Sequence, residues 1–203
     1  METEWSARFQ QMGKSNFTDD EIKHERRMFL PLRESANPQM FKDIPRRMDR
    51  VNENLRGVFR LLVSGQSDWP LYLYGLAGVG KTRAALALCD FVMHSRYYTV
   101  EEASDCIMER PTPSHRGKFI DDLECSGVFV LDEVGCRAKV GDLEYSILKR
   151  VLDGRENLRK PLIVISNHGL DELRKRYDAR IASRLAAGTV VEITDKDRRT
   201  VEK

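Results

Sequence analysis

The sequence predicts an α/β fold in which helices cover both faces of a five-stranded parallel sheet. Segments of helical pattern separate most of the short apolar runs that we interpret as strands, as crossover connections between parallel strands require. A glycine-rich segment directly follows the first of these runs, which is a common arrangement in parallel α/β folds. The five predicted strands are Leu71–Tyr74, Tyr97–Val100, Val128–Leu131, Leu162–Ile165 and Thr189–Ile193.

Composition limits the class of protein. The 203 residues are enough for one compact domain and a short appendage. Charged residues make up 33% of the chain, but the net charge is only +2, so a polyanionic partner is not required. The four cysteines form no CxxC pair, which favours free thiols, and no apolar run approaches the roughly 18 residues of a membrane span. We therefore expect a soluble, cytoplasmic protein that does not enter a membrane.

Residues 1–43 differ from the remainder of the chain. They are polar with scattered aromatics, and Trp5 and Phe9 stand four residues apart. Residues 18–21 have the spacing of a capping box and predict a short helix through about Phe29. An apolar face on such a helix must be buried, either against the domain or in the groove of a partner. We expect a short helical N-terminal segment, 1–43, before a domain that spans 44–203.

The domain begins with a predicted helix. Apolar residues recur at helical spacing from about Ile44 to Leu62, and the segment from Gly65 to Pro70 ends this pattern.

Residues 75–82, Gly-Leu-Ala-Gly-Val-Gly-Lys-Thr, match GxxxxGK[ST] in full. This phosphate-binding loop (P-loop) lies between a predicted strand and a helix predicted over Thr82–Val92. Its backbone N–H groups and the helix N-terminus attract phosphate, Lys81 reaches the β- and γ-phosphates, and the Thr82 hydroxyl is a ligand for Mg²⁺. A turn without function does not account for the complete motif in this position. The expected nucleotide-binding residues here are Gly75, Gly78, Val79, Gly80, Lys81, Thr82 and Arg83.

Two carboxylates follow the apolar run Val128–Leu131. Ligands of open α/β sheets bind at the carboxyl ends of the strands, which places Asp132 to hold the water shell of Mg²⁺ and Glu133 to act as general base on a water molecule. Asn167 follows the strand Leu162–Ile165 closely, where its amide can bond the γ-phosphate or the attacking water, although it can also be a simple turn former.

Arginine pairs occur near the end of the chain. Arg180 and Arg184 stand four residues apart on a predicted helix, which fits either charge stabilisation at a neighbouring subunit's phosphates or an ordinary surface helix. Arg198 and Arg199 are either a second cationic contact or a basic tail.

Five motifs together resemble those of the AAA+ ATPases, specifically the helicase-loader group of DnaC, DnaI and IstB, including phage-encoded members. The resemblance extends from about Phe41 to the C-terminus and depends on the order and spacing of the motifs YGLAGVGKT, FVLDEVG, RKPLIVISNHGLDEL, RIASRLAAGTVVEI and DKDRR.

The resemblance implies roles for single residues. Asn167 would be sensor 1. Arg184 would be the arginine finger, with Arg180 as its neighbour on the same helix. Arg199 would be sensor 2, and Arg198 is the second choice for that role. Phe41 would line the adenine pocket. Two features depart from the pattern: Asp195 stands where many relatives have glycine, and the sequence ends at Lys203, so we expect a reduced or absent C-terminal lid.

The resemblance further implies that the segment Thr99–Cys125 holds extra helices that help to bind single-stranded DNA; it carries His115, Arg116 and Lys118. The implied protein is an ATPase with ATP and Mg²⁺ as cofactors. It would form a homo-oligomer when ATP is bound, hydrolyse ATP at subunit interfaces and load a hexameric replicative helicase onto DNA.

The sequence leaves three other functions open. An IstB-type transposition helper, which binds DNA and recruits a transposase, would use the same site. A nucleotide or small-molecule kinase would also have a P-loop, but it would not need Glu133 to activate water. A switch that does not hydrolyse nucleotide would not need the complete set Lys81, Thr82, Asp132 and Glu133.

Overall fold

The computed structural model describes residues 48, 51–89, 95–108, 113–137 and 139–194, with the backbone alone over 113–117. Several predictions therefore lie outside the described residues: the segment 1–43 with Phe41, the side chains of His115 and Arg116, and Asp195, Arg198 and Arg199.

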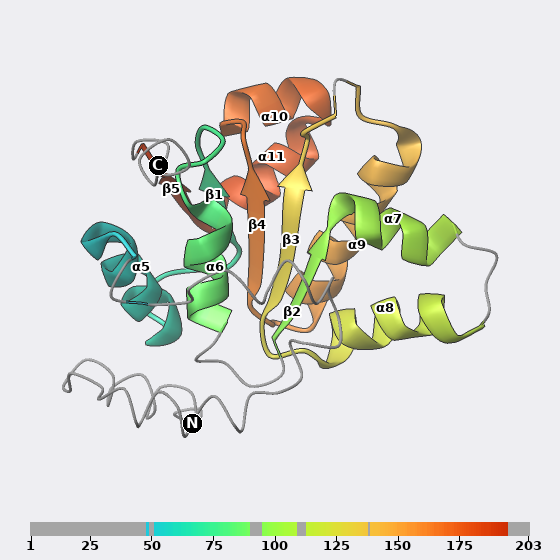
Figure 1. Cartoon of the computed structure of the whole chain (residues 1–203), viewed down its shortest axis with the longest axis horizontal. Helices are drawn as coiled ribbons and strands as arrows, with labels where there is room; N and C mark the ends of the chain where they lie inside the picture. Colours follow the sequence, from blue (N-terminus) through green and yellow to red (C-terminus); the bar gives the residue numbers. More distant parts are fainter. Residues whose placement is uncertain (1–47, 49–50, 90–94, 109–112, 138, 195–203) are drawn as a thin grey trace, which may run out of the picture.

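The described residues contain one five-stranded parallel sheet, as predicted. Its strand order is β2-β3-β4-β1-β5. Every neighbouring pair is parallel, so the carboxyl ends of all five strands meet at one edge (Figure 1). The strands are β1 (Leu71–Tyr74), β2 (Arg96–Thr99), β3 (Phe129–Val134), β4 (Leu162–Ser166) and β5 (Thr189–Glu192).

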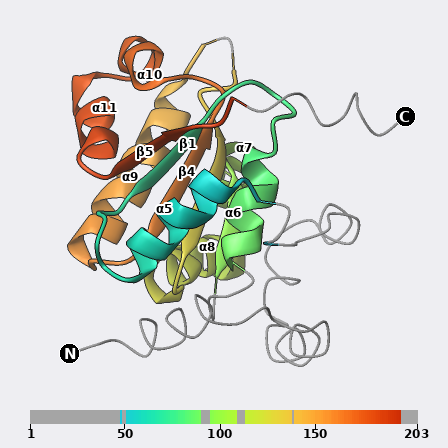
Figure 2. The ribbon, with the colours of Figure 1, turned by 90° about the vertical axis from the view of Figure 1, so that its left-hand side faces the viewer.

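Helices cover both faces of the sheet (Figures 1 and 2). Because successive side chains of a strand point to opposite faces, each central strand contributes to two separate cores. Leu71, Val130 and Ile163 pack with α5 (Glu53–Val63) and α6 (Lys81–Cys89). Tyr72, Leu131 and Val164 pack on the other face, with α7 (Val100–Met108), α8 (Pro113–Cys125), α9 (Asp142–Asn157), α10 (Leu170–Arg176) and α11 (Ala179–Ala186).

Among the described residues, no helix has the length and apolar character that crossing a membrane requires.

Several predicted boundaries were wrong, and three of them have a local reason. The helix that contains Leu55 and Leu62 begins at Glu53 and does not include Val51, because the Asn52 side chain accepts a bond from the Asn54 N–H at 2.9 Å and caps the helix there. Val100 begins a helix rather than ending a strand. Thr99 and Glu102 exchange side chain–backbone hydrogen bonds of 2.8 and 3.1 Å, which is a capping box.

The third correction concerns β3, which continues to Val134 instead of ending at Leu131. Asp132 and Glu133 thus lie within the strand. The pairing of β3 with β4 shifts register between Leu131 and Val134, so the backbone is irregular at the two carboxylates.

Candidate active site

The P-loop connects β1 to α6, with three glycines at positive φ: 145° at Gly75, 82° at Gly78 and 96° at Gly80. At Gly75 space also requires glycine, because a Cβ would lie 2.2 Å from the carbonyl oxygen of Ile193, just after β5. The loop can therefore follow this path only with glycine at these positions.

Lys81 is buried at the start of α6, and its amino group is fixed by three oxygens. It donates to the carbonyls of Gly75 at 2.8 Å and Leu76 at 2.7 Å, and to Asn167 Oδ1 at 2.8 Å. The Asn167 amide also donates to Cys136 Sγ at 3.5 Å. Asn167 therefore joins the P-loop to the loop after β3, where a γ-phosphate sensor would have to lie.

Asp132 lies beside Thr82 at the end of the sheet. The Thr82 hydroxyl donates to Asp132 Oδ2 at 2.6 Å, and the backbone N–H of Glu133 donates to Oδ1 at 2.6 Å. Asp132 is only 4% exposed. Burial raises the pKa of its carboxyl, and the hydrogen bond from Thr82 opposes that shift.

Glu133 has a different environment from its neighbour. Its φ is +62°, a left-handed conformation that non-glycine residues rarely adopt and that is concentrated at functional sites. Its side chain is exposed. Partial burial raises the pKa of the Glu133 carboxyl, and the negative charges of Asp132, Glu101 and Glu102 raise it further. A carboxylate of raised pKa is a stronger base, as proton abstraction from water requires.

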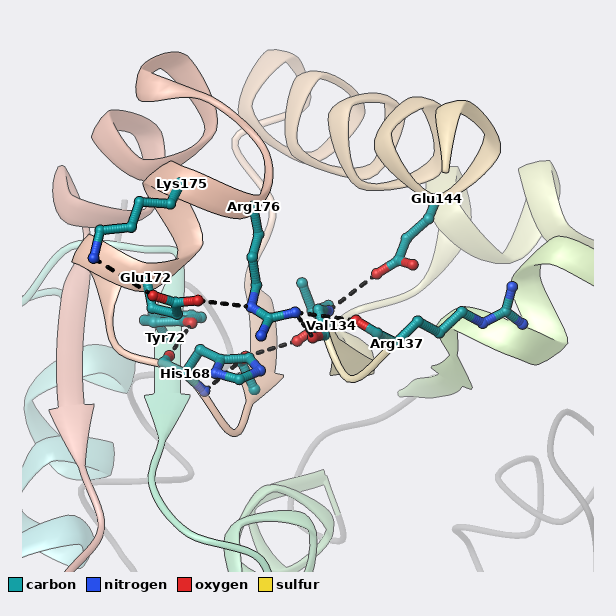
Figure 3. Close-up of polar contacts among 10 residues, drawn as sticks. Tyr72, Val134, Arg137, Glu144, His168, Glu172, Lys175 and Arg176 are labelled. Carbon is teal, nitrogen blue, oxygen red and sulfur yellow. Dashed lines mark hydrogen bonds and ion pairs between the residues drawn. The ribbon is translucent and has the colours of Figure 1, made fainter. Parts of the chain in front are cut away.

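The loop after β3 is fixed by side chains from α9 and α10 (Figure 3). Glu144 of α9 accepts the Gly135 N–H at 3.0 Å, and it also accepts the Tyr177 hydroxyl. Arg176 of α10 pairs with Glu172 at 3.2 Å and donates to the Arg137 carbonyl at 3.0 Å. This network holds the loop that carries the chain away from Glu133.

Arg184 does not take part in this site. Its guanidinium pairs with Asp153 and, at 3.6 Å, with Glu156, both on α9. Arg180, one helical turn earlier on α11, is exposed. Within the described residues, neither arginine forms a hydrogen bond or ion pair with the P-loop, Asp132 or Asn167. This placement fits an action on a second chain.

Arg83 lies in the first turn of α6 and is half-buried, and Val79 is buried within the loop.

Sequence patterns gave no sign of the contacts made by Cys136, Glu144, Arg176 and Tyr177, because each joins residues far apart in the chain.

The donor set fits Mg²⁺ and a nucleoside triphosphate. A hydroxyl and a carboxylate are the hard oxygen ligands that Mg²⁺ prefers, and the ion retains water molecules that a carboxylate can hold. The amide nest, the helix N-terminus and Lys81 supply positive potential for phosphate.

No protein-family model matches the chain. A curated relative, the replicative helicase loader DnaC of Escherichia coli K12, is 22% identical over 120 residues. The aligned segment is 56% of this chain and 49% of that protein, so the match spans about half the length of the relative.

Solved structures show the same fold. DnaI superposes with a TM-score of 0.59 at 23% identity and covers 75% of this chain and 89% of the DnaI chain. The replication initiator DnaA bound to AMPPCP and single-stranded DNA superposes with a TM-score of 0.57 at 20% identity, over 70% of this chain and 44% of that one.

The sheet order, the covering helices and the P-loop define a P-loop α/β fold, which the chain shares with the solved structures of DnaI and DnaA. Within that fold, the chain is similar to the helicase-loader group that includes DnaC and DnaI, and the resemblance stated from the sequence is confirmed.

Proposed function

We propose that this chain is an ATPase of the helicase-loader type, which binds ATP with Mg²⁺ and uses hydrolysis to help load a replicative helicase onto DNA. The observation that carries the proposal is the assembly of Lys81, Thr82, Asp132, Glu133 and Asn167 at the carboxyl edge of one sheet.

In the proposed site, the P-loop amides and Lys81 bind the β- and γ-phosphates, with Mg²⁺ held by Thr82 and by Asp132 through water. Lys81 is well placed to exchange its present carbonyl partners for phosphate oxygens, because its amino group already lies within the loop.

Glu133 takes a proton from the attacking water as the water oxygen bonds to the γ-phosphorus and ADP leaves with the electrons of the broken bond. Asn167 orients the water or the γ-phosphate. Arg184, with Arg180 beside it, stabilises the transition state on an adjacent subunit's ATP, which makes hydrolysis depend on a homo-oligomer formed with ATP.

Similarity to the replicative helicase loader DnaC supports a replicative helicase as the partner, and we propose that this helicase is hexameric. Similarity to a DnaA bound to single-stranded DNA supports contact with such a strand. We further propose that residues 1–43 bind the helicase, that residues 44–203 form the ATPase domain, and that Phe41 and Arg199 contact the nucleotide.

Calorimetry and a loading assay test this proposal together. Lys81→Ala should weaken ATP binding strongly, because a cation and several charge-assisted hydrogen bonds are lost, whereas Lys149→Ala, at an exposed position of α9, should not. Wild-type protein with ATP should increase helicase loading on protein-coated single-stranded DNA, and Lys81→Ala should not. Equal ATP affinity of the two lysine variants would refute the site. Normal ATP binding without any effect on loading would refute the loader role alone.

A further inference from the structure

Two tyrosines stand side by side on β2, and each places its hydroxyl on an aspartate. Tyr97 donates to Asp132 Oδ2 at 2.9 Å, on the face covered by α5 and α6. Tyr98 donates to Asp122 Oδ2 at 2.7 Å, on the opposite face. Only the Tyr97 contact reaches the nucleotide site.

Strand geometry explains the reach of Tyr97. In the β2–β3 register Tyr97 is paired with Val130, and Asp132 lies two residues further along the same face. Two residues of strand span about 6.6 Å, which is close to the length of a tyrosine side chain. A phenylalanine at this position would fill the same space and end one atom short of the carboxylate.

The hydroxyl has a purpose other than packing. Tyr97 is 1% exposed, and a buried hydroxyl is costly unless it is hydrogen-bonded. Its acceptor is Asp132, the carboxylate that we propose holds the water shell of Mg²⁺. Burial, and then the charge of Asp132, raise the pKa of Tyr97 above its ordinary value, so the phenol remains a neutral donor at physiological pH.

The hydrogen bonds also divide the acceptor sites of Asp132. Each carboxylate oxygen offers about two lone-pair sites. Oδ2 accepts the two hydroxyls of Thr82 and Tyr97, and Oδ1 accepts the Glu133 N–H. Both side-chain hydroxyls thus bond Oδ2, and Oδ1 keeps capacity to accept a further donor such as water.

We propose that Tyr97 is a positioning residue for Mg²⁺-dependent nucleotide binding, because it holds the Asp132 carboxylate in the orientation that receives the water shell of the ion. This inference rests on the proposed function, since it needs Asp132 to serve the metal. Partners that orient metal-binding groups typically change metal affinity by about 10- to 100-fold when they are removed.

The matched pair Tyr97→Phe and Tyr98→Phe tests the inference. Each substitution removes one buried hydroxyl from the same strand. ATP affinity is measured by calorimetry in EDTA and over a Mg²⁺ titration. Tyr97→Phe should bind ATP like the wild type in EDTA but need about 10-fold more Mg²⁺ for half of the Mg²⁺-induced gain in affinity. Tyr98→Phe should follow the wild-type Mg²⁺ curve.

A double-mutant cycle separates positioning from a general loss of structure. In an Asp132→Asn background, the further change Tyr97→Phe should no longer shift the Mg²⁺ curve, because the group it positions is absent. Superimposable Mg²⁺ curves for Tyr97→Phe and the wild type would overturn the inference, as would an equal shift in the Asp132→Asn background. A wild type whose ATP affinity is insensitive to Mg²⁺ would instead overturn the proposed metal site itself.

Discussion

Asp132 and Glu133 are adjacent in the sequence but occupy different environments. Asp132 is buried and hydrogen-bonded, whereas Glu133 is exposed and has a left-handed backbone conformation. This difference suits the two roles that we propose, since a group that holds a metal's water must be fixed and a general base must reach a substrate water.

Glu133→Gln keeps the shape of the side chain and removes the base. ATP should still bind, and turnover should fall by roughly 10²-fold or more. Because the pKa of Glu133 is raised, wild-type turnover should decline as the pH falls through that raised value, and the variant should lose this acid limb. Steady-state ATPase measurements from pH 5 to 8 check both effects, and wild-type turnover by the variant would exclude Glu133 as the base.

Asp132→Asn should stabilise the chain in the absence of Mg²⁺ and nucleotide. The folded-state pKa of Asp132 is raised, so its stabilising contribution is complete below the ordinary aspartate pKa and is lost as the pH rises through the raised value. At pH 7.5 the buried charge is therefore unfavourable, and the neutral amide avoids that cost. The melting temperature should exceed that of the wild type at pH 7.5, with a smaller difference at pH 5.

Asp121→Asn, at an exposed position of α8, is the matched control and should leave the melting temperature close to that of the wild type. If Asp132→Asn does not raise the melting temperature at pH 7.5, desolvation does not dominate at this carboxyl.

At the scale of elements, Arg155 of α9 joins three parts of the fold. It is 1% exposed, and it donates to the carbonyls of Leu123, Ser126 and Gly127, and to that of Pro161 before β4. Burial lowers the pKa of the guanidinium to about 10, so it remains a cation at neutral pH. The helix α9 that supports the site through Glu144 is thus itself anchored to the base of β3 and β4.

Arg155→Met should lower the free energy of unfolding by about 3 kcal/mol, because several buried carbonyls lose their donor. For a chain of this size that corresponds to a fall in melting temperature of about 6–12 °C. Arg150→Met, an exposed position on the same helix, should change it little. Thermal unfolding of both variants gives the comparison, and equal melting temperatures would show that water replaces the guanidinium without cost.

The elements were predicted better than the contacts between them. The P-loop, the five strands and the helix of Arg180 and Arg184 have local patterns, namely an ordered motif, apolar runs and helical spacing. Glu144, Arg155 and Tyr97 are single polar residues in ordinary helix or strand patterns. Their partners are distant in the sequence, so only the folded chain brings the contacts together.

At the scale of the whole molecule, the described residues form the α/β domain that we propose to be the ATPase, and we propose that residues 1–43 bind the partner. We predict that deletion of residues 1–35 leaves ATP binding and turnover intact, because the regular α/β pattern starts later in the sequence. Binding of the replicative helicase should be lost. Calorimetry with ATP and a pull-down with purified helicase measure the two properties. Lost ATP binding would place the segment in the core, and retained helicase binding would place the partner site elsewhere.

We propose that two chains form one active site. Arg184 pairs with Asp153 and Glu156 of its own chain and, within the described residues, contacts no part of the site there, so in the proposed function it acts on a neighbour's ATP.

The most direct test mixes two inactive proteins, Arg184→Ala and Lys81→Ala, under conditions where they demonstrably co-assemble. Each variant alone should hydrolyse ATP at least about 10²-fold more slowly than the wild type, since one lacks the finger and the other the phosphate site. In mixed assemblies, an intact Arg184 from the Lys81→Ala chain meets an intact phosphate site on the Arg184→Ala chain. We predict partial recovery of ATPase activity in the mixture. A mixture no more active than its separate components would contradict it.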